Sequence, residues 1–192
     1  MSILDELNVE QRKAAEKIEG PVLILAGAGS GKTRTVTYRI AHMIKEMGIS
    51  PLNILALTFT NKAAKEMKER AEQLVGSDSH NLAISTFHSF AVRLLKTYAD
   101  RIGYGRNFNI YDVDDQKSLI GKIIKELNIN SDEISPSKVA NRISKLKEDG
   151  IGVKELEKEI DVKLYSNRIF YDIYKQYDST LRANNAMDFS DL

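Results

Sequence analysis

The chain has 192 residues, no cysteine and a formal net charge of +1, with 42% hydrophobic and 29% charged residues. This composition predicts a globular protein with one large domain, or one domain with an insertion. It excludes disulfides, thiolate metal sites and a cysteine nucleophile, and the near-neutral charge does not by itself indicate nucleic acid. Without a secretory signal, or an apolar run of the roughly 18 residues that span a membrane, a cytoplasmic protein is expected.

Strands and helices are expected to alternate in the first half of the chain. Asn8 and Gln11 form the capping box of a helix that ends near residue 19, and Gly20-Pro21 then interrupts the chain. The apolar run 21–25 predicts a buried strand. The elements expected after it are a helix at 34–47, a strand at 53–59, a helix at 62–75, a strand at 82–85 and a helix at 86–102. This alternation predicts an α/β fold with a parallel sheet.

The pattern becomes mostly helical after residue 103. A short extended piece is expected at 108–111, and Ser135-Pro136 is typical of a helix start. The expected helices cover 113–127, 136–148, 154–160 and 164–184. We therefore predict an α/β core over 1–103, a helical subdomain over 104–185 and the start of a further element at 186–192.

A glycine-rich stretch follows the first predicted strand and leads into a helix. It consists of Ala26, Gly27, Ala28, Gly29, Ser30, Gly31, Lys32 and Thr33. In such a loop the backbone N–H groups converge on phosphate oxygens, and the helix N-terminus adds positive potential. Lys32 is expected to reach the outer phosphates, and the Thr33 hydroxyl to bind Mg²⁺. The alternative is a glycine-rich turn that binds nothing, but this motif at a strand-to-helix junction favours a nucleoside triphosphate site.

Hydrolysis would also need a carboxylate at the end of another core strand, to hold Mg²⁺ and orient water. No apolar run ends convincingly in Asp or Glu. Asp112, Asp114 and Asp115 follow Ile110-Tyr111, but they introduce a helix and are better explained as its cap. The sequence therefore predicts the phosphate half of a nucleotide site without its metal half.

Two similar junctions follow the next two predicted strands. The first contains Phe59, Thr60 and Asn61, and the second contains Thr86, Phe87 and His88. An aromatic ring beside polar groups at a helix N-terminus could stack a base and bind phosphates of single-stranded nucleic acid. Alternatively, Phe59 belongs to the core, Thr60 or Asn61 caps a helix and His88 is a surface residue. Spacing alone favours this structural alternative for the first junction, but two such junctions on one sheet edge make a single-strand track more plausible than either does alone.

A locally basic run follows the second junction. It consists of Arg93, Lys96, Arg101 and Arg106. Such a run either contacts a phosphate backbone or forms a solvated helix face.

With these motifs in order, the chain resembles the UvrD/PcrA/Rep-type superfamily 1 DNA helicases over essentially its whole length. Leu7-Asn8-x-x-Gln11 is similar to the family's Q motif, and Gly27 to Arg34 to its motif I. The resemblance implies that Gln11 reads the adenine edge and that Arg34 stacks on the base. Thr58–Ala64 resembles motif Ia and Thr86–Ser89 motif Ib, which line the single-stranded DNA path. The helical stretch is then expected to be a 1B subdomain inserted into a RecA-like 1A domain, with 186–192 returning to 1A.

The resemblance also implies an activity for the whole protein. It predicts an ATP- and Mg²⁺-dependent helicase or translocase that moves 3′ to 5′ on single strands and acts at duplex junctions in DNA repair or replication. The family's acidic metal-binding motif and second RecA-like domain are expected beyond Leu192, so the chain itself is expected not to hydrolyse ATP. Two alternatives remain open, the motor part of a RecB/AddA-like helicase-nuclease and a nucleotide-gated binding module without motor function.

Overall fold

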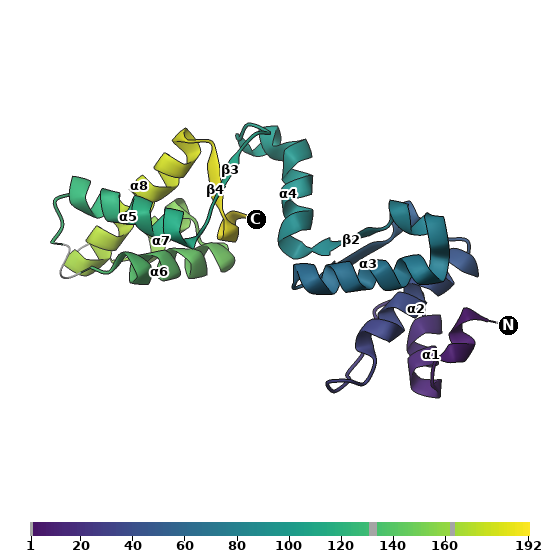
Figure 1. The fold of residues 1–192 in the computed structure, drawn as a ribbon. Helices are drawn as coiled ribbons and strands as arrows, with labels where there is room; N and C mark the ends of the chain where they lie inside the picture. Colours follow the sequence, from purple (N-terminus) through teal and green to yellow (C-terminus); the bar gives the residue numbers. More distant parts are fainter. Residues whose placement is uncertain (1, 131–133, 162–163) are drawn as a thin grey trace. The chain divides into compact units, whose positions relative to one another are not determined.

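The computed structural model describes residues 2–130, 134–161 and 164–192 (Figure 1). The chain forms two compact units, one ending at Phe90 and the other beginning at Ala91. The boundary predicted from the sequence lies at 103, whereas compactness divides the chain earlier, within α4. Each unit contains a pair of parallel strands and several helices, so the fold is mixed α/β and mostly helical.

The first unit is built around two parallel strands and the helix that connects them. Thr58 of one strand lies opposite Thr86 of the other. The elements are α1 (Val9–Glu16), α2 (Lys32–Lys45), β1 (Leu55–Thr58), α3 (Asn61–Val75), β2 (Ala83–Thr86) and the first residues of α4 (Phe87–Tyr98). Apolar residues of α2, α3 and the strands form one core, which contains Ile40, Ala41, Ile44, Ile54, Ala56, Met67, Ala71, Val75 and Leu82. Figure 1 shows α3 running beside β2 and α2.

The predicted strand at 21–25 is not formed. This segment has no regular secondary structure, and Leu23 and Leu25 are 82% and 86% exposed. A buried parallel strand needs a hydrogen-bonded neighbour and helices on both faces. Among the described residues, β1 pairs only with β2, so the apolar run has no strand beside it. Where the sequence predicts a larger RecA-like sheet, the described residues of the first unit form a sheet of two strands.

Helix α1 begins where the sequence predicts but ends earlier than expected. Asn8 accepts a hydrogen bond from the Gln11 N–H at 2.9 Å, and the Gln11 side chain accepts one from the Asn8 N–H at 3.3 Å, which is the predicted capping box. The helix ends at Glu16 rather than near residue 19. Arg39 of α2 donates a 2.8 Å hydrogen bond to the carbonyl of Ala14, an acceptor that one more helical turn would have used.

The second unit is a small helical bundle with one pair of short strands. It contains the rest of α4, β3 (Asn109–Tyr111), α5 (Val113–Glu126), α6 (Pro136–Glu148), α7 (Val153–Glu159), α8 (Tyr165–Ala183) and β4 (Ala186–Asp188). The strand expected at 108–111 and all four expected helices are present. The expected helix at 86–102 is shorter, because a 3₁₀ turn over Ala99–Ile102 follows α4. Asp112 accepts hydrogen bonds from the N–H groups of Asp114 and Asp115, which confirms its role as the cap of α5.

Strand β4 lies in this second unit, beside β3, with Tyr111 opposite Asp188. Among the helices that the structure describes, none has the length and apolar character that a membrane crossing requires.

A buried ion-pair cluster joins α6 to the end of the chain. The Lys147 ammonium lies 2.8 Å from carboxylate oxygens of both Asp188 and Asp191, and the Tyr177 hydroxyl donates to Asp188 at 2.9 Å. The side chain of Lys147 is only 7% exposed and that of Asp188 is 1% exposed. Burial, together with the Asp188 carboxylate, raises the pKa of Tyr177, so its hydroxyl remains a donor. Removing one partner would leave a buried charge without compensation.

We predict that Lys147→Met lowers the free energy of unfolding of the helical unit by about 3–5 kcal/mol, because the buried Asp188 carboxylate then loses its cationic partner. Urea unfolding followed by tyrosine fluorescence measures this change. Every tyrosine except Tyr38 lies after residue 90, and there is no tryptophan. The matched control is Lys145→Met on the exposed side of α6, which is expected to change stability by less than about 0.5 kcal/mol. Equal effects of the two substitutions would contradict the assigned role of the cluster.

Candidate nucleotide site and strand-edge surface

The glycine-rich loop precedes α2, as the sequence predicts. Gly31 is the residue before the helix and has a positive φ of 86°. It has no side chain that could cap the helix N–H groups. A Cβ at Gly31 would lie 2.7 Å from the Gln11 side-chain nitrogen. The left-handed backbone favours glycine here, and the absence of a Cβ also leaves room for the close approach of Gln11. The uncapped N–H groups of α2 provide the anion-binding end of a helix dipole.

Side-chain hydrogen bonds hold the loop together. Gln11 donates to the Ser30 carbonyl at 3.0 Å, and Ser30 Oγ donates to the Gly27 carbonyl at 2.7 Å. Lys32 Nζ donates to the carbonyls of Ala26 and Gly27 at 2.8 and 2.7 Å. The cation that the sequence assigns to phosphate binding thus lies at the loop itself, and Gln11 of α1 contacts the same loop.

A cavity of about 250 Å³ lies between the loop and α1. Its lining residues are Asn8, Glu10, Gln11, Ala14, Ile24, Leu25, Ala26, Ser30, Lys32 and Thr35. Four of the ten predicted nucleotide-site residues therefore share one cavity, namely Gln11, Ala26, Ser30 and Lys32. Thr35 was not predicted, although its buried hydroxyl donates to the Gly31 carbonyl at 3.2 Å and supports the loop. Gly27, Ala28, Gly29 and Gly31 form the adjoining turn.

Besides the residues of the adjoining turn, two predicted site residues lie outside this cavity lining, Thr33 and Arg34. Thr33 is half-buried in the first turn of α2, and its carbonyl accepts a hydrogen bond from Thr37 at 3.0 Å. The Arg34 guanidinium donates to the Glu6 carbonyl at 2.9 Å and lies 3.6 Å from the Glu6 carboxylate. It also lies 5.2 Å from the centre of the Tyr38 ring.

Glu6 and Tyr38 were not predicted from the sequence. The Tyr38 hydroxyl donates a hydrogen bond to the Glu6 carboxylate, which raises the pKa of Tyr38. This cluster fixes Arg34 on the N-terminal segment. Sequence spacing could not have indicated this cluster, because Arg34 and Tyr38 lie 28 or more positions after Glu6 along the chain.

The strand-edge surface combines the two predicted junctions. Because Thr58 and Thr86 are register partners, the residues that follow them, Phe59 and Phe87, emerge side by side. Their ring centres are 5.5 Å apart at an interplanar angle of 40°. Phe59 is 88% exposed and Phe87 is 50% exposed, so the alternative that Phe59 belongs to the core is wrong. The two junctions share one edge of the sheet, as predicted.

The threonines of this edge serve as helix caps. Thr60 accepts a hydrogen bond from the Ala63 N–H at 3.1 Å, which confirms the capping interpretation of this residue. Thr86 is buried and accepts from the Ser89 N–H at 3.2 Å. Asn61 and His88 are exposed beside the aromatic pair. The edge therefore offers two exposed rings next to the N-termini of α3 and α4.

The predicted basic run lies mostly on solvated surface. Arg106 is 3.6 Å from Asp100, and the Arg101 guanidinium lies 5.0 Å from the centre of the Tyr98 ring. Arg93 and Lys96 are exposed.

A glycine-rich loop that ends in Gly-Lys-Thr at a helix N-terminus, within a mixed α/β fold, is typical of the phosphate-loop proteins. The family model described as "UvrD/REP helicase N-terminal domain" matches residues 7–192, so the chain belongs to this family.

Curated relatives of the chain carry the name "ATP-dependent DNA helicase PcrA". The chain is 46% identical over 191 residues to the protein of Staphylococcus aureus (strain Mu50) and 47% identical over 191 residues to that of Staphylococcus epidermidis (strain RP62A). Both alignments cover all of this chain but 26% of the relative, so the chain spans about a quarter of the length of these relatives.

We predict that Gly31→Ala loosens the loop, because the new methyl group displaces the Gln11 side chain and strains a left-handed backbone. Hydrogen exchange measured by mass spectrometry should become faster in peptides that contain Gln11 and the loop. Gly27→Ala is the matched control, since no heavy atom lies within 4 Å of a Cβ there and its φ is not positive. Unchanged exchange in Gly31→Ala would show that the contact between Gln11 and the loop does not hold the loop.

Proposed function

We propose that this chain supplies the ATP-binding and single-strand-contacting part of an ATP-dependent DNA helicase. The observation that carries the proposal is the cavity in which Gln11 and Lys32 meet on the glycine-rich loop. Family membership and the printed function of the relatives support the same conclusion. The 3′ to 5′ direction rests on the resemblance alone and is part of the proposal.

The residues around the loop fit a nucleoside triphosphate with Mg²⁺. The loop amides and the N-terminus of α2 would hold phosphate oxygens, and Lys32 would exchange its two carbonyl acceptors for phosphate. The Thr33 hydroxyl would bind the metal, which neutralises phosphate charge. Gln11 would recognise the adenine edge, and Arg34 would stack on the base after release from Glu6.

The exposed rings of Phe59 and Phe87 would contact bases of single-stranded DNA. Such contacts tolerate any sequence because every base has a flat π-face. Asn61, His88, Thr60 and Thr86 are proposed to complete this surface. Because Thr60 and Thr86 already cap helices, we assign them the role of presenting helix N-termini to phosphates.

We predict that the chain binds the fluorescent nucleotide mant-ATP in the presence of Mg²⁺ and that Lys32→Ala weakens binding by tenfold or more, about 1.4 kcal/mol. Lys45→Ala at the other end of α2 is the matched control and is expected to have no effect. Fluorescence titration gives both dissociation constants. Equal binding by the Lys32→Ala variant and the unmodified chain would rule out the proposed phosphate contact.

We also expect no ATP hydrolysis above the Lys32→Ala background, with or without single-stranded DNA.

We predict that Phe59→Ala and Phe87→Ala each weaken binding of a fluorescein-labelled oligo-dT, by about 1–3 kcal/mol per lost stacking contact. Fluorescence anisotropy measures the affinity. Leu52→Ala serves as the control, because Leu52 is equally apolar and 76% exposed but precedes β1, at the opposite end of the strand. If all three variants bind oligo-dT as the unmodified chain does, the aromatic pair is not a DNA contact.

A further inference from the structure

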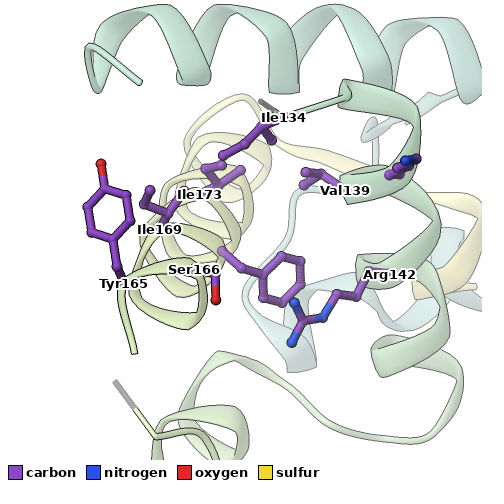
Figure 2. Close-up of a pocket in the computed structure, with 9 residues that line it drawn as sticks. Ile134, Val139, Arg142, Tyr165, Ser166, Ile169 and Ile173 are labelled. Carbon is purple, nitrogen blue, oxygen red and sulfur yellow. The ribbon is translucent and has the colours of Figure 1, made fainter. Parts of the chain in front are cut away.

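A second cavity lies between α6 and α8 in the helical unit, remote in sequence from every motif discussed above (Figure 2). Its volume is about 280 Å³. The residues that line it are Ile134, Lys138, Val139, Arg142, Tyr165, Ser166, Ile169, Phe170 and Ile173. This size is just below the roughly 300–1,000 Å³ of pockets for drug-sized ligands, and suits one or two large side chains.

The walls of this cavity are apolar. Val139 of α6 faces Ile169 and Ile173 of α8 across the opening, and Ile134 lies at one end (Figure 2). Tyr165 stands at the mouth and is 74% exposed. The side chains of Val139 and Ile173 are themselves buried, with 7% and 0% exposed, whereas Ile134 and Ile169 are half-buried. A hollow with apolar walls is suited to accept another apolar group.

The α6 side of the cavity is positively charged. Lys138 and Arg142 are one helical turn apart, and Lys145 continues the same face, so three cations form a stripe beside the cavity. The Arg142 guanidinium lies 3.8 Å from the centre of the Phe170 ring, which keeps it at the cavity wall. Among the described residues, no carboxylate forms an ion pair with any of these three cations, whereas Lys147 on the same helix has two. The stripe therefore provides positive charge that a ligand can compensate.

A smaller neighbouring cavity lies beside the first, on the neighbouring face of α8. It has a volume of about 250 Å³ and shares Tyr165 and Ile169 with the first cavity. Its other lining residues are Leu127, Asn128, Ile129, Arg168 and Asp172. The two hollows adjoin at Tyr165 and Ile169 and together form a groove that crosses α8, in which each hollow can accept a side chain of a bound peptide.

We propose that this groove binds an acidic amphipathic peptide segment of a partner protein. One or two large apolar side chains of the segment, such as Leu or Phe, enter the hollow between α6 and α8. Asp or Glu residues of the same segment contact Lys138 and Arg142. The branched aliphatic walls favour a peptide over nucleic acid, because phosphates would use only the cations and would leave the apolar hollow open.

Selection from a phage library of random linear peptides, with the whole chain as bait, tests this proposal. The peptides recovered should carry Leu, Ile or Phe close to Asp or Glu. Synthesised and labelled, they should lose affinity about tenfold or more when Lys138→Glu is combined with Arg142→Glu, which replaces attraction by repulsion. Ser166→Trp should lose as much by placing a ring over the hollow without changing charge.

Two controls distinguish a loss of affinity caused by the groove from one caused by a general change of charge or by misfolding. Lys154→Glu with Lys158→Glu reverses an equally spaced pair of exposed cations on α7 and should change affinity by less than about twofold. Because Arg142 also packs on Phe170, Lys138→Gln with Arg142→Gln provides a second, milder variant, and circular dichroism checks that each variant is folded.

Three outcomes would overturn the proposal. One is the recovery of no peptide above background. Another is a set of peptides that bind all variants equally. The third is loss of single-stranded or duplex DNA binding in the charge-reversed variant while Ser166→Trp binds DNA normally, which would assign the cations to phosphates.

Discussion

The hydrogen bond from Gln11 to the Ser30 carbonyl is the contact on which the candidate nucleotide site depends. The segment before the glycine-rich loop forms no strand here, so no described strand holds the loop from its N-terminal side. Its position is set instead by Gln11, by Lys32 on the loop carbonyls and by the first turn of α2. The absence of a Cβ at Gly31 permits this arrangement. The same side chain that caps α1 therefore also orders the phosphate loop, which links the start of the chain to the site.

The parallel pairing of β1 with β2 organises the other surface. Register alone places Phe59 next to Phe87 and brings the N-termini of α3 and α4 to the same edge. Two helix N-termini with exposed rings between them suit a polyanion that carries flat bases. In the proposed function, the nucleotide loop and this edge are separate contact surfaces within one compact unit. The Arg34–Glu6–Tyr38 cluster adds a restraint on the residue proposed to stack on adenine.

The sequence predicted much of the fold because many signals are local. The Asn8–Gln11 capping box, the cap at Asp112 and the helical periodicities of α5, α6 and α8 each depend on neighbouring residues, and each is confirmed. The prediction of a strand at 21–25 was wrong because an apolar run does not show whether a neighbouring strand is present. The exposure of Phe59 and the partners of Arg34 depend on contacts between residues far apart in sequence. Spacing could not supply them.

On helix α6, burial distinguishes a charge that stabilises the fold from charges that a ligand can reach. Lys147 is buried against Asp188 and Asp191, where breaking the pair is costly, and so it is fixed. Lys138 and Arg142 on the same helix border an apolar hollow and form no ion pair among the described residues. Their sequence pattern does not distinguish these roles, because each is a cation in a helix of mixed charge. The packing of α6 against α8 and the chain end assigns Lys147 to stability, and Lys138 and Arg142 to a candidate interface.

The most direct test of the account is a two-dimensional NMR titration of the labelled chain with ATP and Mg²⁺. The account predicts that the largest amide shifts occur in Gly27–Arg34 and at Gln11, with small shifts along α5 to α8. Shifts concentrated outside the loop, or none at saturating nucleotide, would contradict the assignment of this loop and Gln11 as the nucleotide site.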